Sequence, residues 1–144
     1  MSSGNAEQTR RILLAEDSAD NVLIIQLYLK NHPYVIDVAE NGRDAVQMFG
    51  ERAYDLVLMD IQMPGMDGYE ATERIRELEQ KKGNESVPII AVTAHASEEI
   101  RRRVLDCGGD AYITKPVPKA RLVEAIQTAL ESRQEAGQET NSSS

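Results

Sequence analysis

The segment Leu56-Val-Leu-Met-Asp60 places four apolar residues directly before an aspartate. An apolar run without polar alternation is typical of a strand that is buried on both faces, as in a parallel sheet. A charged group at the end of such a strand is costly unless it is paired. We therefore expect Asp60 to have a function at the end of a central strand.

Further short apolar or β-branched runs lie on both sides of this segment, at residues 11–15, 35–39, 89–93 and 111–114. Between these runs, and after the last one, apolar residues recur at helical spacing. The alternation predicts an α/β fold, a doubly wound (βα)5 parallel sheet with strand order 2-1-3-4-5. Gly83 is expected to end the helix before the longest loop.

The 144 residues are enough for one domain, and 41% of them are apolar. We place that domain at residues 10–133. Residues 1–9 and 134–144 are polar and lack apolar periodicity, so we predict that both are flexible tails.

The charge balance excludes several classes of partner. With 16 basic and 24 acidic residues the net charge is -8, which argues against a nucleic-acid partner. No apolar run approaches the ~20 residues of a membrane helix, and the first residues lack a signal peptide, so we expect a cytoplasmic protein without membrane contact. One cysteine and two histidines cannot form a closed Cys/His zinc site, so a bound metal must be held mainly by oxygen.

Ligands of parallel α/β sheets bind beyond the carboxyl ends of the strands. Three carboxylates follow predicted strands there, those of Glu16, Asp17 and Asp60. Grouped carboxylates repel one another unless a cation neutralises them. Mg²⁺, which is usually held by few carboxylates together with phosphate oxygens, fits this arrangement better than Ca²⁺.

The same edge should carry Thr93 and Lys115, which follow or end the last two predicted strands. Lys115 would pair with Asp60. With its charge neutralised, Asp60 can act as a carboxylate nucleophile that forms an aspartyl phosphate. Thr93 and Lys115 would then donate hydrogen bonds to the phosphoryl oxygens.

Structural roles for the same residues remain open at this point. Glu16 and Asp17 could be an acidic cap at the start of the next helix. Thr93 alone could be an ordinary strand-end residue, and Lys115 alone a solvated lysine. Their joint position favours the functional interpretation.

Four segments resemble those of the receiver domains of two-component response regulators, including the single-domain chemotaxis type. The segments are Glu16-Asp17, residues 56–68, Ala91-Val-Thr-Ala94 and Lys115-Pro116. The resemblance covers nearly the whole predicted domain and implies a flavodoxin-like fold. At Gly108-Gly109-Asp110 the family more often has an alanine before the acid, from which we expect only a local loop effect.

The resemblance implies that Asp60 accepts a phosphoryl group from a histidine kinase or a histidine phosphotransfer protein. Asp17 and Asp60 would ligate Mg²⁺, with Glu16 acting through water and the backbone carbonyl of Gln62 as a further ligand. It also implies a cis peptide bond before Pro116.

The resemblance further implies that Thr93 and Tyr112 switch the protein between two states. A downstream protein would then read the face formed by the helix near residues 100–104, the strand 111–114 and the last helix. Gln62 and His95 would tune dephosphorylation. Beyond its own phosphorylation and dephosphorylation the protein would not be an enzyme, and we expect a monomer or weak dimer.

Three alternatives remain. The chain could be a receiver domain excised from a hybrid histidine kinase. It could be an aspartate-nucleophile phosphohydrolase, although that chemistry needs an acid-base group near Asp60, commonly two residues later, where Gln62 stands. It could also be a structural module that binds partners without phosphorylation, which the complete acidic and lysine set argues against.

Overall fold

A computed structural model of the chain describes the backbone of residues 8–143 and the side chains of residues 8–133. Five parallel strands form one sheet in the order β2-β1-β3-β4-β5, which confirms the predicted fold class and strand order. The strands are β1 (Arg10–Ala15), β2 (Tyr34–Ala39), β3 (Leu56–Asp60), β4 (Ile89–Thr93) and β5 (Ala111–Thr114).

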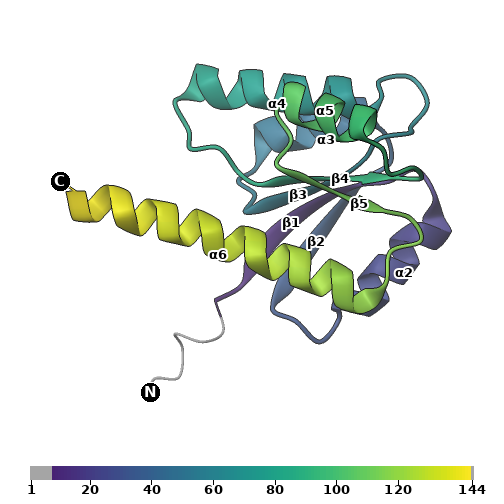
Figure 1. Cartoon of the computed structure of the whole chain (residues 1–144), viewed down its shortest axis with the longest axis horizontal. Helices are drawn as coiled ribbons and strands as arrows, with labels where there is room; N and C mark the ends of the chain where they lie inside the picture. The colour runs from purple at the N-terminus through teal and green to yellow at the C-terminus, as the bar shows by residue number, and fades with distance from the viewer. Residues whose placement is uncertain (1–7, 144) are drawn as a thin grey trace.

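Helices cover both faces of this sheet (Figure 1). On one face lie α3 (Gly42–Glu51), α4 (Gly68–Lys82) and α5 (Glu98–Asp106), and on the other lie α2 (Ala19–Leu29) and α6 (Lys119–Ser143). All residues of β3 and β4 are buried, as the continuous apolar runs predicted. Because all five strands run parallel, their carboxyl ends lie at the same edge of the sheet.

The polar turns after the strands start the helices. Ser18, Asn41, Asp67 and Ser97 are the N-caps of α2, α3, α4 and α5, and each side chain accepts a hydrogen bond from the backbone N–H of the third residue of its helix. Gly83 ends α4 in the left-handed conformation at φ 68°, as predicted.

Two large apolar clusters hold the helices to the sheet. Leu13, Val57 and Met59 pack with α3 and α4 on one face, and Ile12, Leu14 and Leu58 pack with α2 and α6 on the other. Alternate residues of one strand thus enter different clusters. The buried residues Leu122, Ile126 and Leu130 confirm the apolar stripe expected on the last helix.

The backbone of α6 is helical as far as Ser143, beyond the apolar stripe. The domain limits of 10–133 and the flexibility of the tails stay predictions, and residues 1–7 and 144 lie outside the described part of the chain. Within the described residues, no helix combines the length and the apolar character needed to cross a membrane.

Gly68, the first residue of α4, lies against the end of β3. A Cβ atom at this position would stand 2.4 Å from the carbonyl oxygen of Asp60 and 2.8 Å from Cα of Ile61. The N–H of Gly68 donates a hydrogen bond to the carbonyl of Ile61 at 2.9 Å. The first turn of α4 is thus fixed to the backbone around Asp60, a contact that only glycine permits.

We predict that Gly68→Ala lowers the free energy of unfolding by about 1–3 kcal/mol, because the added methyl group must displace backbone atoms. Urea denaturation monitored by circular dichroism measures the change. Gly50→Ala is the matched control, since a Cβ there meets only Cδ1 of Leu78 at 3.6 Å. Equal stabilities of the two variants would contradict the close contact.

Candidate phosphorylation site

The parallel register brings the predicted site residues to the carboxyl edge of the sheet. Asp60 pairs with Val92 on β4, so Thr93 lies one residue beyond it. The backbone N–H of Lys115, directly after β5, donates to the carbonyl of Thr93 at 2.7 Å. Glu16 follows β1, and its N–H donates to the carbonyl of Ala39. Residues far apart in the sequence therefore meet at one edge.

Three carboxylates gather at this edge, as predicted. Glu16, Asp17 and Asp60 each offer an oxygen, and these oxygens lie within 4.8 Å of one another. Glu16 and Asp60 are each only 2% exposed, whereas Asp17 is exposed. Two carboxylates that share a buried site repel each other strongly unless positive charge lies nearby.

Lys115 supplies positive charge. Its Nζ lies 3.2 Å from Oδ2 of Asp60 and 3.5 Å from Oε1 of Glu16. The predicted pairing of Lys115 with Asp60 is therefore present, and the ammonium group also contacts Glu16. One lysine therefore contacts two buried carboxylates.

The two carboxylate oxygens of Asp60 have different surroundings. Oδ1 accepts a hydrogen bond from the backbone N–H of Gln62 at 3.1 Å. Oδ2 is buried and accepts no hydrogen bond of good geometry from any described residue, although Lys115 lies beside it. A buried carboxylate oxygen that accepts no such hydrogen bond can instead bind a cation or act as a nucleophile.

Glu16 is held at the start of α2. Its Oε2 accepts hydrogen bonds from the backbone N–H of Ser18 at 3.1 Å and from Nδ2 of Asn21 at 3.5 Å. Burial, together with the negative charge of Asp60, raises the pKa of Glu16, while Ser18 and Lys115 oppose the rise. Glu16 thus has the helix-start contact that its capping interpretation required, and it also belongs to the acidic cluster.

This donor set fits Mg²⁺. The ion prefers carboxylate, carbonyl and water oxygens and is commonly bound through one or two carboxylates. The acidic cluster offers three carboxylates, and the buried Oδ2 of Asp60 accepts no hydrogen bond of good geometry from a described residue. The described geometry therefore matches the expectation of an oxygen-held divalent cation.

The remaining predicted residues surround this cluster. The hydroxyl of Thr93 is buried and exchanges hydrogen bonds at 3.2 Å with the backbone N–H and carbonyl of His95. His95 and Gln62 have exposed side chains. Tyr112 is half-buried on β5, where it pairs with Ala91.

The Lys115–Pro116 peptide bond is cis, the isomer that the resemblance implies.

Sequence reasoning missed some contributors. Ser18 and Asn21 orient Glu16, and Gly68 permits the approach of α4 to Asp60. The serine directly before a helix was a readable N-cap signal. The contact made by Gly68 has no sequence signal, because a tertiary backbone contact leaves no local pattern.

Known proteins place this geometry in a family. The model of the response regulator receiver domain matches residues 12–127. The sensor protein GacS of Pseudomonas syringae pv. syringae is 41% identical over 116 residues, which are 81% of this chain and 13% of that protein. The chain thus spans a small part of the curated sensor kinases that it matches.

Two solved structures share the architecture. The receiver domain of the sensor histidine kinase PA1611 from Pseudomonas aeruginosa PAO1, solved with a magnesium ion coordinated in its active-site cleft, is 35% identical with a TM-score of 0.76, over 86% of this chain and 99% of that one.

The second is a chain of the co-crystal structure of the Saccharomyces cerevisiae histidine phosphotransfer signaling protein Ypd1 with the receiver domain of its downstream response regulator Ssk1. It is 32% identical with a TM-score of 0.80, over 84% of this chain and 88% of that one. Family model, fold and acidic edge agree, and the chain belongs to the response regulator receiver domains of two-component phosphorelays.

Proposed function

We propose that Asp60 is the phosphoacceptor of this receiver domain and that a histidine kinase or a histidine phosphotransfer protein supplies the phosphoryl group. The observation that carries this proposal is the buried Oδ2 of Asp60, which accepts no hydrogen bond of good geometry and lies 3.2 Å from Nζ of Lys115. A relative in complex with a phosphotransfer protein supports the choice of donor.

In the proposed reaction Oδ2 of Asp60 is the nucleophile. The N–H of Gln62 binds Oδ1 and so fixes the carboxylate. Oδ2 attacks the phosphorus, and the bond between phosphorus and the donor's histidine nitrogen breaks with its electron pair left on that nitrogen. Lys115 then pairs with a phosphoryl oxygen, where charge accumulates during the transfer.

Glu16, Asp17, Asp60 and the backbone carbonyl of Gln62 would hold Mg²⁺. When bound, the ion would neutralise the carboxylates and the phosphoryl oxygens. The magnesium ion in the cleft of the Pseudomonas aeruginosa relative supports this assignment.

The phosphorylated state is proposed to act through protein contacts. Thr93 and Tyr112 lie on the same face of the sheet, at Thr93↔Thr114 and Ala91↔Tyr112 in the register. A hydroxyl drawn toward the phosphoryl group would leave His95, and the surface of α5, β5 and α6 would change for a downstream protein.

Other properties stay predictions. They are a cytoplasmic location, a monomeric or weakly dimeric state, the absence of a nucleic-acid or membrane partner, and the absence of activity on other substrates. Membership of a longer hybrid kinase is supported by the small share of the curated relatives that the chain spans. A phosphohydrolase is disfavoured because the side chain of Gln62 is neutral and exposed.

We predict that acetyl phosphate with Mg²⁺ adds one phosphoryl group and that Asp60→Asn abolishes the addition, because an amide is a poor nucleophile. Intact-mass measurement checks this. Asp67→Asn is the control, since asparagine caps a helix as well as aspartate does. Labelling of Asp60→Asn, or of the wild type in excess EDTA, would contradict the assignment, and steady hydrolysis of a generic phosphate ester would indicate a phosphohydrolase.

A second prediction concerns how phosphorylation of Asp60 changes the structure of α5 and β5. Thr93→Ala should still be phosphorylated but should lose the chemical-shift changes in α5 and β5, because the hydroxyl that links the site to the following loop is gone. Thr93→Ser keeps that hydroxyl and should restore them. NMR shifts in Thr93→Ala equal to those of the wild type would disprove the coupling.

A third prediction concerns the lifetime of the aspartyl phosphate. We expect that the exposed imidazole of His95 obstructs the attacking water, so that His95→Ala shortens the lifetime of phosphorylated Asp60. Loss of label over time, followed by intact mass, measures it. His32→Ala, on the turn between α2 and β2, is the control. A longer lifetime would show that the imidazole assists the water.

A further inference from the structure

Helix α5 is attached to the molecule by a small cluster of its own. The buried members of this cluster are Ile61, Tyr69, Ala91, Val104 and Cys107, with Ile100 and Tyr112 packed against them. Of the nine residues of α5, all of them described, only Val104 is buried. A helix with so little buried surface can shift at lower cost than the helices of the two large clusters.

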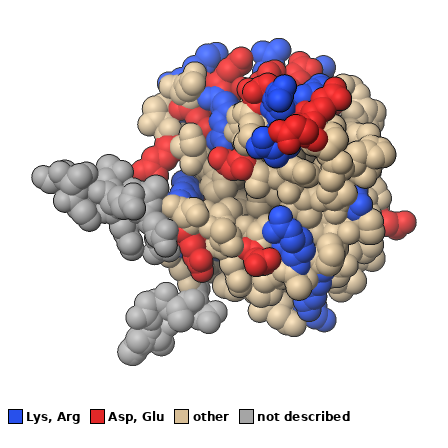
Figure 2. Space-filling model, in the orientation of Figure 1, with Lys and Arg blue, Asp and Glu red and all other residues tan. Residues whose placement is uncertain are grey.

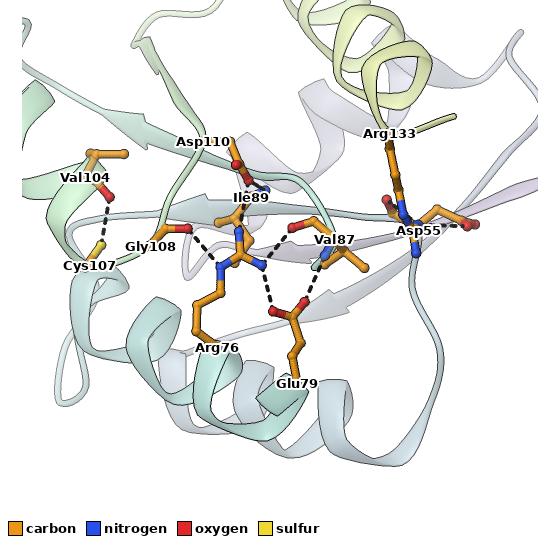
Figure 3. A network of polar contacts seen from close by, with 10 residues as sticks. All are labelled: Asp55, Arg76, Glu79, Val87, Ile89, Val104, Cys107, Gly108, Asp110 and Arg133. Carbon is orange, nitrogen blue, oxygen red and sulfur yellow. Dashed lines mark hydrogen bonds and ion pairs between the residues drawn. The ribbon is translucent and has the colours of Figure 1, made fainter. Parts of the chain in front are cut away.

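The chain directly after α5 is pinned to α4. The guanidinium group of Arg76 donates hydrogen bonds of 2.8–2.9 Å to the carbonyls of Gly108 and Val87 and to the carboxylates of Glu79 and Asp110 (Figure 3). Gly108 has φ 107°, and a Cβ there would stand 2.8 Å from Cγ of Arg76. Arg76 therefore holds the loop between α5 and β5, while α5 itself is held by its own contacts.

A second contact joins the last turn of α5 to the first turn of α4. The guanidinium carbon of Arg103 lies 4.0 Å from the centre of the Tyr69 ring, which is a cation–π contact. The hydroxyl of Tyr69 is buried and has no hydrogen-bond partner among the described residues. The ring is thus held by packing and by Arg103.

Tyr69 follows Gly68, whose N–H donates a hydrogen bond to the carbonyl of Ile61, so the backbone at Tyr69 is tied to the chain directly after Asp60. The N-terminal end of α5 is held differently. The hydroxyl of Thr93 bonds to both backbone groups of His95, in the loop that leads to the N-cap Ser97. Both bonds are lost if that hydroxyl turns to a phosphoryl group.

We propose that the contact between Tyr69 and Arg103 is a restraint that holds α5 in its resting position, and that its strength sets how readily phosphorylation of Asp60 displaces the helix. This proposal rests on the proposed function. A contact made only in the resting state must be broken on activation, so it lowers the population of the active state. Weakening it raises the apparent affinity for any ligand that selects that state.

The test is a titration with beryllofluoride, a tetrahedral analogue of a phosphoryl group, in the presence of Mg²⁺ and followed by NMR. Arg103→Ala should bind about two- to fivefold more tightly than the wild type, the range that a cation–π contact at an exposed site implies. Arg102→Ala is the matched control, since Arg102 is the exposed neighbour on the same helix.

Variants of Tyr69 distinguish loss of the contact with Arg103 from a general destabilisation of α5. Tyr69→Phe keeps the ring and should retain the wild-type affinity, whereas Tyr69→Leu should resemble Arg103→Ala. The double variant Arg103→Ala with Tyr69→Leu should bind no more tightly than either single variant, because both remove one interaction. Additive effects, or equal affinities of Arg103→Ala and Arg102→Ala, would overturn the proposal.

Hydrogen exchange of the untreated protein makes the two proposals distinguishable. Backbone amides of α5 should exchange faster in Arg103→Ala than in Arg102→Ala, with other helices unchanged. Wild-type protein that binds no beryllofluoride and accepts no phosphoryl group would defeat the proposed function, while the exchange rates would still decide whether the contact restrains α5. Equal rates in the two variants would overturn the restraint.

Discussion

A buried carboxylate at the end of a buried strand is the constraint on which the rest of the site depends. Asp60 is 2% exposed, and desolvation of a charge is tolerated only when opposite charge or hydrogen bonds replace water. Lys115 reaches it from the end of β5, and the N–H of Gln62 binds its other oxygen. Each of these groups is in place only because the strands lie parallel and end at the same edge.

The backbone at Asp60 also lies against the start of α4. Glycine at position 68 lets α4 approach the carbonyl of Asp60, and from that first turn Tyr69 reaches the cluster under α5. The surface of α4 and α5 carries charges of both signs, and Figure 2 shows basic and acidic side chains interleaved in this region. Pairs such as Arg101 with Glu98 and Arg74 with Glu70 account for part of it. Electrostatic selection of a partner on this face would depend on the pattern of charges rather than on a single sign.

The fold and the acidic edge could be predicted because their signals are local. Continuous apolar runs mark the strands, capping residues mark the helix starts, and the strand order places Glu16, Asp60 and Lys115 together. The contacts of Arg76 and Arg103 could not be predicted, since each joins segments far apart in sequence and an arginine on a helix is usually solvated. The position of the Thr93 hydroxyl, turned to His95, depends on the loop conformation, which no residue pattern specifies.

The separation of the two large clusters has an evolutionary consequence. One contains α2 and α6, the other α3 and α4, and the small cluster under α5 lies with the second on the same face. Substitutions at distant sites without shared partners act almost independently on stability. Residues such as Ile126 and Leu130 can therefore be substituted, along with the residues that pack against them, while Tyr69, Val104 and their neighbours stay unchanged. A lineage of such chains could replace much of the packing on one side of its sheet and still keep the same response at the other.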